Sequence, residues 1–169
     1  MRKTELKIIN GKLSNVQADA YLLPFLPYHE CPTGVRYEVA AGGALGLRDF
    51  IDLRLKARHL AYGDAFFFDS KGGNAKMLIA VICRHPECNE EDMLKAIKRG
   101  FIAALCKAEK YNIKHIAMSP LCCMDGLDIV TFAKSLEIMI ENGLEHGIEK
   151  ITIATDDKET VTKLYHILE

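Results

Sequence analysis

Residues 76–118, KMLIAVICRHPECNEEDMLKAIKRGFIAALCKAEKYNIKHIAM, hold a strand, a helix and a second strand in succession. Lys76–Cys83 and Ile113–Met118 are short apolar runs of strand length. Between them, Asn89 precedes three acidic residues, a helix-start signal because Asn caps free amides and acids complement the helix dipole. Two strands joined by a crossover helix are expected to run parallel within one sheet.

A hairpin is predicted immediately upstream of this unit. Gly63–Asp69 (GDAFFFD) is strand-like, and the segment SKGGNA separates it from Lys76. The sequence Gly72-Gly73-Asn74 within that segment is typical of a tight turn. The sheet is therefore expected to contain at least one antiparallel pair. Two more strands are predicted near the amino terminus, at Glu5–Ile9 and Ala20–Phe25.

The downstream part of the chain repeats the alternation of helix and strand. Apolar residues over 129–140 follow helical spacing, with Asp128 before them as a cap and Asn142-Gly143 after them as a stop signal. A strand is expected at Lys150–Ala154. A last helix follows, for which Thr155 is the expected cap.

These elements predict an α/β fold. Leu47–Leu60 adds an amphipathic helix whose Leu47, Phe50, Ile51 and Leu55 share one face. Because most strands are joined through helices and one pair is a hairpin, we expect a three-layer α/β/α arrangement with a mixed, mostly parallel sheet.

Composition limits the classes of function. The 169 residues, 49% of them hydrophobic, suit a single domain spanning 1–169. A net charge of -1 offers no broad basic surface for nucleic acid, and no apolar run is long enough for a signal peptide or a membrane span. The six cysteines are scattered, which favours reduced thiols in a cytoplasmic protein.

Any ligand site is expected beyond the carboxyl ends of the parallel strands. Ligands bind there because loops meet helix amino termini, where backbone N–H groups point outward. Three loops satisfy that rule: 27–35, 84–89 and 119–128.

The order of the segments carries a family resemblance. The chain begins with GKLSNVQADAYLLPF, continues through Gly34-Val35 into VAAGG, and then presents GDAFFFDS, KMLIAVIC, a long helix and HIAMSPL. With its terminal helix, strand and helix, this pattern resembles a macro domain over nearly the whole chain. The resemblance implies a mixed-sheet α/β/α domain that binds ADP-ribose; some members hydrolyse ADP-ribosyl linkages.

The resemblance also implies a set of ligand-binding residues. Gly34 and Val35 match the glycine-rich loop along the ribose and diphosphate, where backbone amides bind phosphate oxygens without a particular side chain. The segment 121–126 matches the second phosphate loop of the family. No cofactor and no metal ligand is expected. The implied binding residues are Gly34, Val35, Ser119, Leu121, Cys122, Cys123 and Gly126.

At three places the chain departs from the family pattern. Lys12 follows Gly11 where the family usually has an Asp that accepts from the adenine amino group, and lysine cannot accept that hydrogen bond. Leu23-Pro24-Phe25 stands where an Asn-rich catalytic turn is typical. The one glycine of the second loop, Gly126, is out of register. We therefore expect nucleotide binding, assign no catalytic residue and do not expect hydrolysis of the usual kind.

Three alternatives stay open. A non-catalytic macro-like domain could act as a scaffold in a homo-oligomer, as in the amino-terminal domains of leucyl aminopeptidases. Cys83, His85 and Cys88, joined by Cys122 and Cys123, could hold a soft metal such as zinc. The segment 31–36 could place a reactive Cys31 beside Arg36 in an anion-binding loop. The other histidines show no triad spacing and are expected to be surface or satisfied side chains: His29, His59, His115, His146 and His166.

Overall fold

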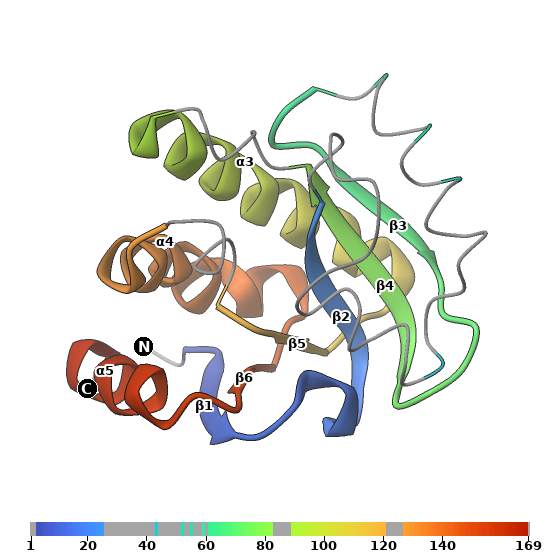
Figure 1. The fold of residues 1–169 in the computed structure, drawn as a ribbon. Helices are drawn as coiled ribbons and strands as arrows, with labels where there is room; N and C mark the ends of the chain where they lie inside the picture. Colours follow the sequence, from blue (N-terminus) through green and yellow to red (C-terminus); the bar gives the residue numbers. More distant parts are fainter. Residues whose placement is uncertain are drawn as a thin grey trace.

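The computed structural model describes residues 3–25, 61–82, 89–120 and 127–168, together with the single positions 43, 52, 55 and 59. Within these residues, six strands form one sheet in the order β1-β6-β5-β2-β4-β3. The strands are β1 (Glu5–Asn10), β2 (Ala18–Phe25), β3 (Ala65–Asp69), β4 (Ala75–Ile82), β5 (His115–Met118) and β6 (Lys150–Thr155). The helices are α3 (Glu90–Ala108), α4 (Ile129–Asn142) and α5 (Lys158–Leu168), with short 3-10 turns η1 (Leu13–Asn15), η2 (Glu109–Tyr111) and η4 (Gly143–His146) (Figure 1).

The sheet is mixed and mostly parallel, as the sequence predicts. β3 runs antiparallel to β4, whereas the other four neighbouring pairs are parallel. The turn between β3 and β4 contains Gly73 at a φ of 75°, a conformation that favours glycine because it has no Cβ. All six predicted strands are present.

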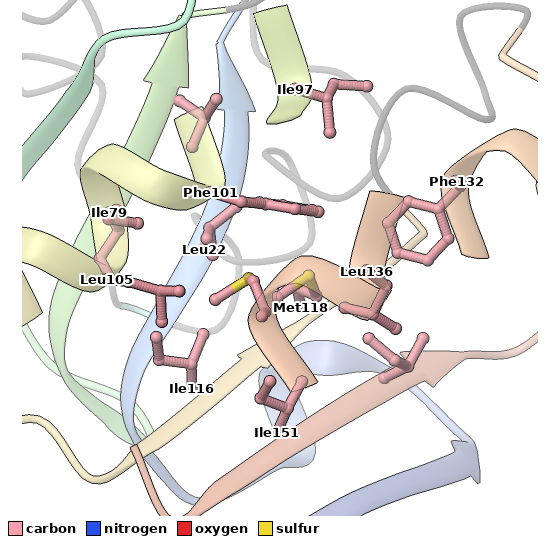
Figure 2. Close-up of a cluster of buried hydrophobic side chains, with 14 of the residues drawn as sticks. Leu22, Ile79, Ile97, Phe101, Leu105, Ile116, Met118, Phe132, Leu136 and Ile151 are labelled. Carbon is pink, nitrogen blue, oxygen red and sulfur yellow. The ribbon is translucent and has the colours of Figure 1, made fainter. Parts of the chain in front are cut away.

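Helices α3, α4 and α5 pack on one face of the sheet (Figure 1). Alternate strand residues such as Leu22, Ile79 and Ile116 point toward these helices, because successive strand side chains alternate between faces. Phe101 of α3 lies among them and is 0% exposed (Figure 2). None of the helices in the described ranges has the length and apolar character needed to cross a membrane.

The opposite face of the sheet holds a second buried cluster. It contains the alternate strand residues, among them Tyr21, Phe25 and Ile82, together with Leu13 of η1. The helix predicted at 47–60 lies largely outside the described residues. Three of its positions are described: Asp52 and Leu55 are helical, and His59 lies in a turn and is exposed. Leu55, which we expected on the apolar face, is 53% exposed.

The helix starts agree only in part with the expected caps. Asn89 caps α3 as predicted, with its side chain accepting from the Asp92 N–H at 2.8 Å. Asp128 occupies the cap position of α4, but its side chain makes no capping hydrogen bond. The expected cap of α5 is wrong, because β6 continues through Thr155 and the helix begins later. Asp157 caps it instead, accepting from the N–H groups of Glu159 and Thr160.

Candidate functional site

Three neighbouring parallel strands end toward the same edge of the sheet, with β5 ending three residues short of β2. β2 lies between β5 and β4, with Leu22 paired to Met118 and Phe25 paired to Ile82. The three loops that the sequence indicates as ligand-binding therefore all leave from this carboxyl edge. Adjacent carboxyl ends are where open α/β sheets hold their ligands.

Most residues of the expected site lie outside the described part of the chain. Ser119 is described; it follows β5 directly and is half-buried. The possible metal ligands Cys83, His85 and Cys88 and the segment 31–36 also lie outside, so those alternatives stay predictions. The expected binding residues outside the described ranges are Gly34, Val35, Leu121, Cys122, Cys123 and Gly126.

Two helix amino termini meet at the same edge. Thr131 in the first turn of α4 donates a hydrogen bond to Oε1 of Glu90 in the first turn of α3, at 3.1 Å. The first turn of α3 carries three acids, which offset its helix dipole, whereas the first turn of α4 carries none. Asp128 makes no side-chain capping bond, so the first backbone N–H groups of α4 have no side-chain cap, while the carboxylates of Asp128 and Glu90 offset part of the dipole at this end.

The end of β2 brings no acid or base to this edge. Leu23, Pro24 and Phe25 continue the strand and are buried. Phe25 is 3% exposed and belongs to the second core cluster. The segment that departs from the catalytic turn of the family is therefore part of the hydrophobic core. Lys12 is exposed and occupies the cap position of η1 without a side-chain capping bond.

A second polar region lies at the opposite, amino edge, and the sequence did not indicate it. A hollow of about 390 Å³ opens there between the starts of β2, β4 and β5. His115 is half-buried in its wall, and its Nε2 lies 2.8 Å from Oγ1 of Thr152. Burial lowers the pKa of His115, and the charge of Lys150 lowers it further. No local motif in the sequence marks this arrangement, because it depends on the order of the strands.

The sequence matches no protein-family model and no curated protein. Its fold, in contrast, is similar to that of solved macrodomains. A point mutant of the Oceanobacillus iheyensis macrodomain superposes with a TM-score of 0.82 at 11% identity, covering 99% of this chain and 95% of that one. The Trypanosoma brucei macrodomain in complex with ADP gives 0.76 at 12% identity, covering 97% and 68%. A second Oceanobacillus iheyensis mutant, with ADPR, gives 0.77 at 12% identity, covering 99% and 96%.

These superpositions establish the macrodomain fold for nearly the whole chain. The fold class expected from the sequence and the resemblance to macro domains are thereby confirmed at the level of architecture. Sequence identities of 11–12% support a shared fold and no statement about function.

Proposed function

We propose that this chain binds ADP-ribose or a related nucleoside diphosphate at the carboxyl ends of β5, β2 and β4. The observation that carries the proposal is the meeting of three strand ends with the amino terminus of α4 at one edge of a macrodomain fold. Solved neighbours of this fold contain ADP or ADPR. A diphosphate suits such an edge because backbone amides and a helix dipole attract its negative oxygens.

Two loops would hold the diphosphate in this proposal. The amides around Gly34 and Val35 would bind along the ribose and diphosphate. The loop after β5 would bind the diphosphate from the opposite side. Of the expected binding residues in that second loop, the structure describes Ser119, which directly follows Met118 at the end of β5. The remaining proposed contacts come from Leu121, Cys122, Cys123 and Gly126.

The proposal does not include hydrolysis. A hydrolytic site needs a group that activates water or protonates the leaving oxygen. Leu23, Pro24 and Phe25, at the end of the central strand, are buried and apolar and cannot do either. We therefore propose a binding domain, and no catalytic residue is assigned.

Several finer features belong to the same proposal. We take residues 1–169 as one macro-like domain in the cytoplasm, with its thiols reduced and with neither nucleic acid nor membrane as partner. Cys106, the cysteine that the described ranges include, is free and exposed, which accords with reduced thiols. Assembly into a homo-oligomer is compatible with this function.

Titration calorimetry with ADP-ribose tests the proposal. Gly34→Asp and Gly126→Asp each place a carboxylate beside the diphosphate and should weaken binding about tenfold or more, which corresponds to about 1.4 kcal/mol. Asn112→Asp is the matched control. It makes the same change in charge at the opposite edge of the sheet, at a residue whose φ of 53° Asp also tolerates.

The outcome separates the proposal from the scaffold alternative. Circular dichroism must first show that each variant keeps the wild-type fold. Wild type that gives neither heat nor a thermal shift with about millimolar ADP-ribose, ADP or NAD contradicts the proposal. An oligomer that persists on dilution, without any ligand response, then favours the scaffold role.

A further inference from the structure

Three polar residues line up across neighbouring strands at the amino edge of the sheet. Ala20 pairs with Ile116 and with Met77, so that Asp19 lies beside His115 on one side and beside Lys76 on the other. All three point to the face opposite α3, because the next residues on that side, such as Tyr21, belong to the second cluster. Neighbouring strands lie about 4.8 Å apart, which sets the spacing of this His–Asp–Lys row.

The row lies along the hollow of about 390 Å³ at this edge. Residues from three separate segments line the open hollow: the start of β2, the hairpin turn before β4 and the start of β5. Gln17 and Asn74 are further polar residues of the lining. A hollow of this volume is large enough for a small metabolite.

Part of the hydrogen-bonding capacity of the row is already used. Oδ2 of Asp19 accepts from the backbone N–H groups of Lys114 and His115, at 2.9 Å each. These bonds fix the carboxylate at the start of β5. Nε2 of His115 is engaged with Thr152, which is 2% exposed and holds the imidazole in place.

Three polar atoms of the His–Asp–Lys row have no partner among the described residues. Within the described part of the chain, Oδ1 of Asp19, Nδ1 of His115 and Nζ of Lys76 make no hydrogen bond or ion pair. The next lysine along the row, Lys150, differs because it forms an ion pair with Glu5 at 3.7 Å. The hollow thus holds an acceptor, an imidazole nitrogen and an ammonium donor beside one another.

We propose that this hollow is a second binding site, separate from the carboxyl-edge site, for a small zwitterion such as a free α-amino acid. The ammonium of the ligand donates to Oδ1 of Asp19 and to Nδ1 of His115. Its carboxylate accepts from Nζ of Lys76. The opposite charges of an α-amino acid are separated by one carbon, and the row presents opposite charges on adjacent strands in the matching order.

Simpler ligands fit the row less well. An anion without an ammonium would pair with Lys76 but would face the carboxylate of Asp19, which a like charge disfavours. A cation without a carboxylate would pair with Asp19 but would leave Lys76 beside it without a partner. A ligand with both charges pairs with the two ends of the row together.

Amide NMR of the whole chain tests the site with three matched probes. Alanine carries both charges, propionate lacks the ammonium and ethylamine lacks the carboxylate. We expect alanine to shift the amide signals of Asp19, Lys76 and His115 in a saturable way, and to bind about tenfold more tightly than either truncated probe. The probes leave the signals of Met118 and Leu127, at the carboxyl edge, unchanged.

Two variants assign the ends of the ligand. Lys76→Met should abolish the advantage of alanine over ethylamine, and Asp19→Asn should abolish its advantage over propionate while keeping an oxygen for the Lys114 and His115 amides. Lys110→Met, at an exposed lysine of η2 outside the hollow, should behave as wild type.

Either of two results overturns the proposal. The first is that none of the probes gives a saturable shift at concentrations up to about 50 mM. Any binding would then be too weak for a specific site. The second is that propionate or ethylamine binds as well as alanine. ADP-ribose titrated into the same samples reports on the carboxyl edge, so failure of one site is distinguishable from failure of the other.

Discussion

Gly100 of α3 lies directly against Val81 of β4. A Cβ on Gly100 would come within 2.2 Å of Cγ1 and 3.3 Å of Cβ of Val81. Both residues are buried, and neither the strand nor the helix can move away without disturbing the core around Phe101. This contact sets how closely α3 approaches the sheet.

We expect Gly100→Ala to destabilise the protein. Alanine favours a helix by about 1 kcal/mol over glycine, but overpacking a core typically costs about 1–3 kcal/mol, and a 2.2 Å approach is severe enough for the second effect to win. Urea denaturation should show a lower midpoint with an unchanged m-value. Gly11→Ala is the control, because a Cβ there meets nothing within 4 Å; equal loss in both variants would contradict this account.

Removing the cap of α3 should cost more than removing the residue at the cap position of α4. Asn89→Ala loses the hydrogen bond to the Asp92 N–H, and such losses typically cost about 1 kcal/mol. Asp128→Ala should cost less, because its side chain makes no capping bond. Thermal unfolding of the two variants, side by side with wild type, checks the order; a larger loss at Asp128 would show that the cap assignment is wrong.

Acid should weaken the fold through His115. Burial is the main cause of its lowered pKa, and Lys150 and Lys7 act in the same direction while Asp19 and Glu5 oppose them. The folded state therefore favours neutral His115, and the unfolded chain binds the proton more readily. This contribution to stability is fully present above the ordinary pKa of 6.5 and is lost as the pH falls through the lower folded value.

His115→Gln tests that direction. Glutamine keeps a hydrogen-bonding group near Thr152 but does not titrate, so the variant should lose less stability than wild type between neutral and mildly acidic pH. Unfolding free energies from urea curves at several pH values give the comparison, and NMR titration of the imidazole gives its pKa directly. An imidazole that titrates above 6.5 would reverse the predicted slope.

Lys12→Asp should strengthen binding of ADP-ribose. In macro domains, which this chain resembles, an Asp at this position accepts from the adenine amino group, and a hydrogen bond to a charged group is worth about 1.5–3 kcal/mol. Lys12 is exposed and its side chain makes no capping bond, so the fold should tolerate the change. Calorimetry should show at least about a tenfold gain, with Lys12→Gln as the control that only removes the positive charge.

Local signals account for the parts of the fold that the sequence predicted well. The Gly72-Gly73 turn and the Asn89 cap act over a few residues, and each is found where expected. The predicted cap of α5 was wrong because Thr155, Asp156 and Asp157 can all cap a helix. What decides among them is the length of β6, whose last pair joins Thr155 to Asn10 of the distant β1.

Strand order accounts for what the sequence could not indicate. Asp19, Lys76 and His115 are far apart along the chain, and only the neighbouring positions of β5, β2 and β4 bring them into one row. In the sequence alone, His115 is therefore an isolated histidine. The carboxyl-edge site was easier to anticipate, because every parallel strand contributes its following loop to the same edge, whatever the order of the strands.

Titration of the isotope-labelled chain with ADP-ribose, followed through its amide signals, tests the central claim most directly. We predict saturable shifts at the carboxyl edge, including Met118, Ser119 and Leu127, while Asp19 and Lys76 at the amino edge stay unchanged. Shifts confined to the amino edge, or no saturable shift at all, would contradict the claim that this fold holds a nucleoside diphosphate where its parallel strands end.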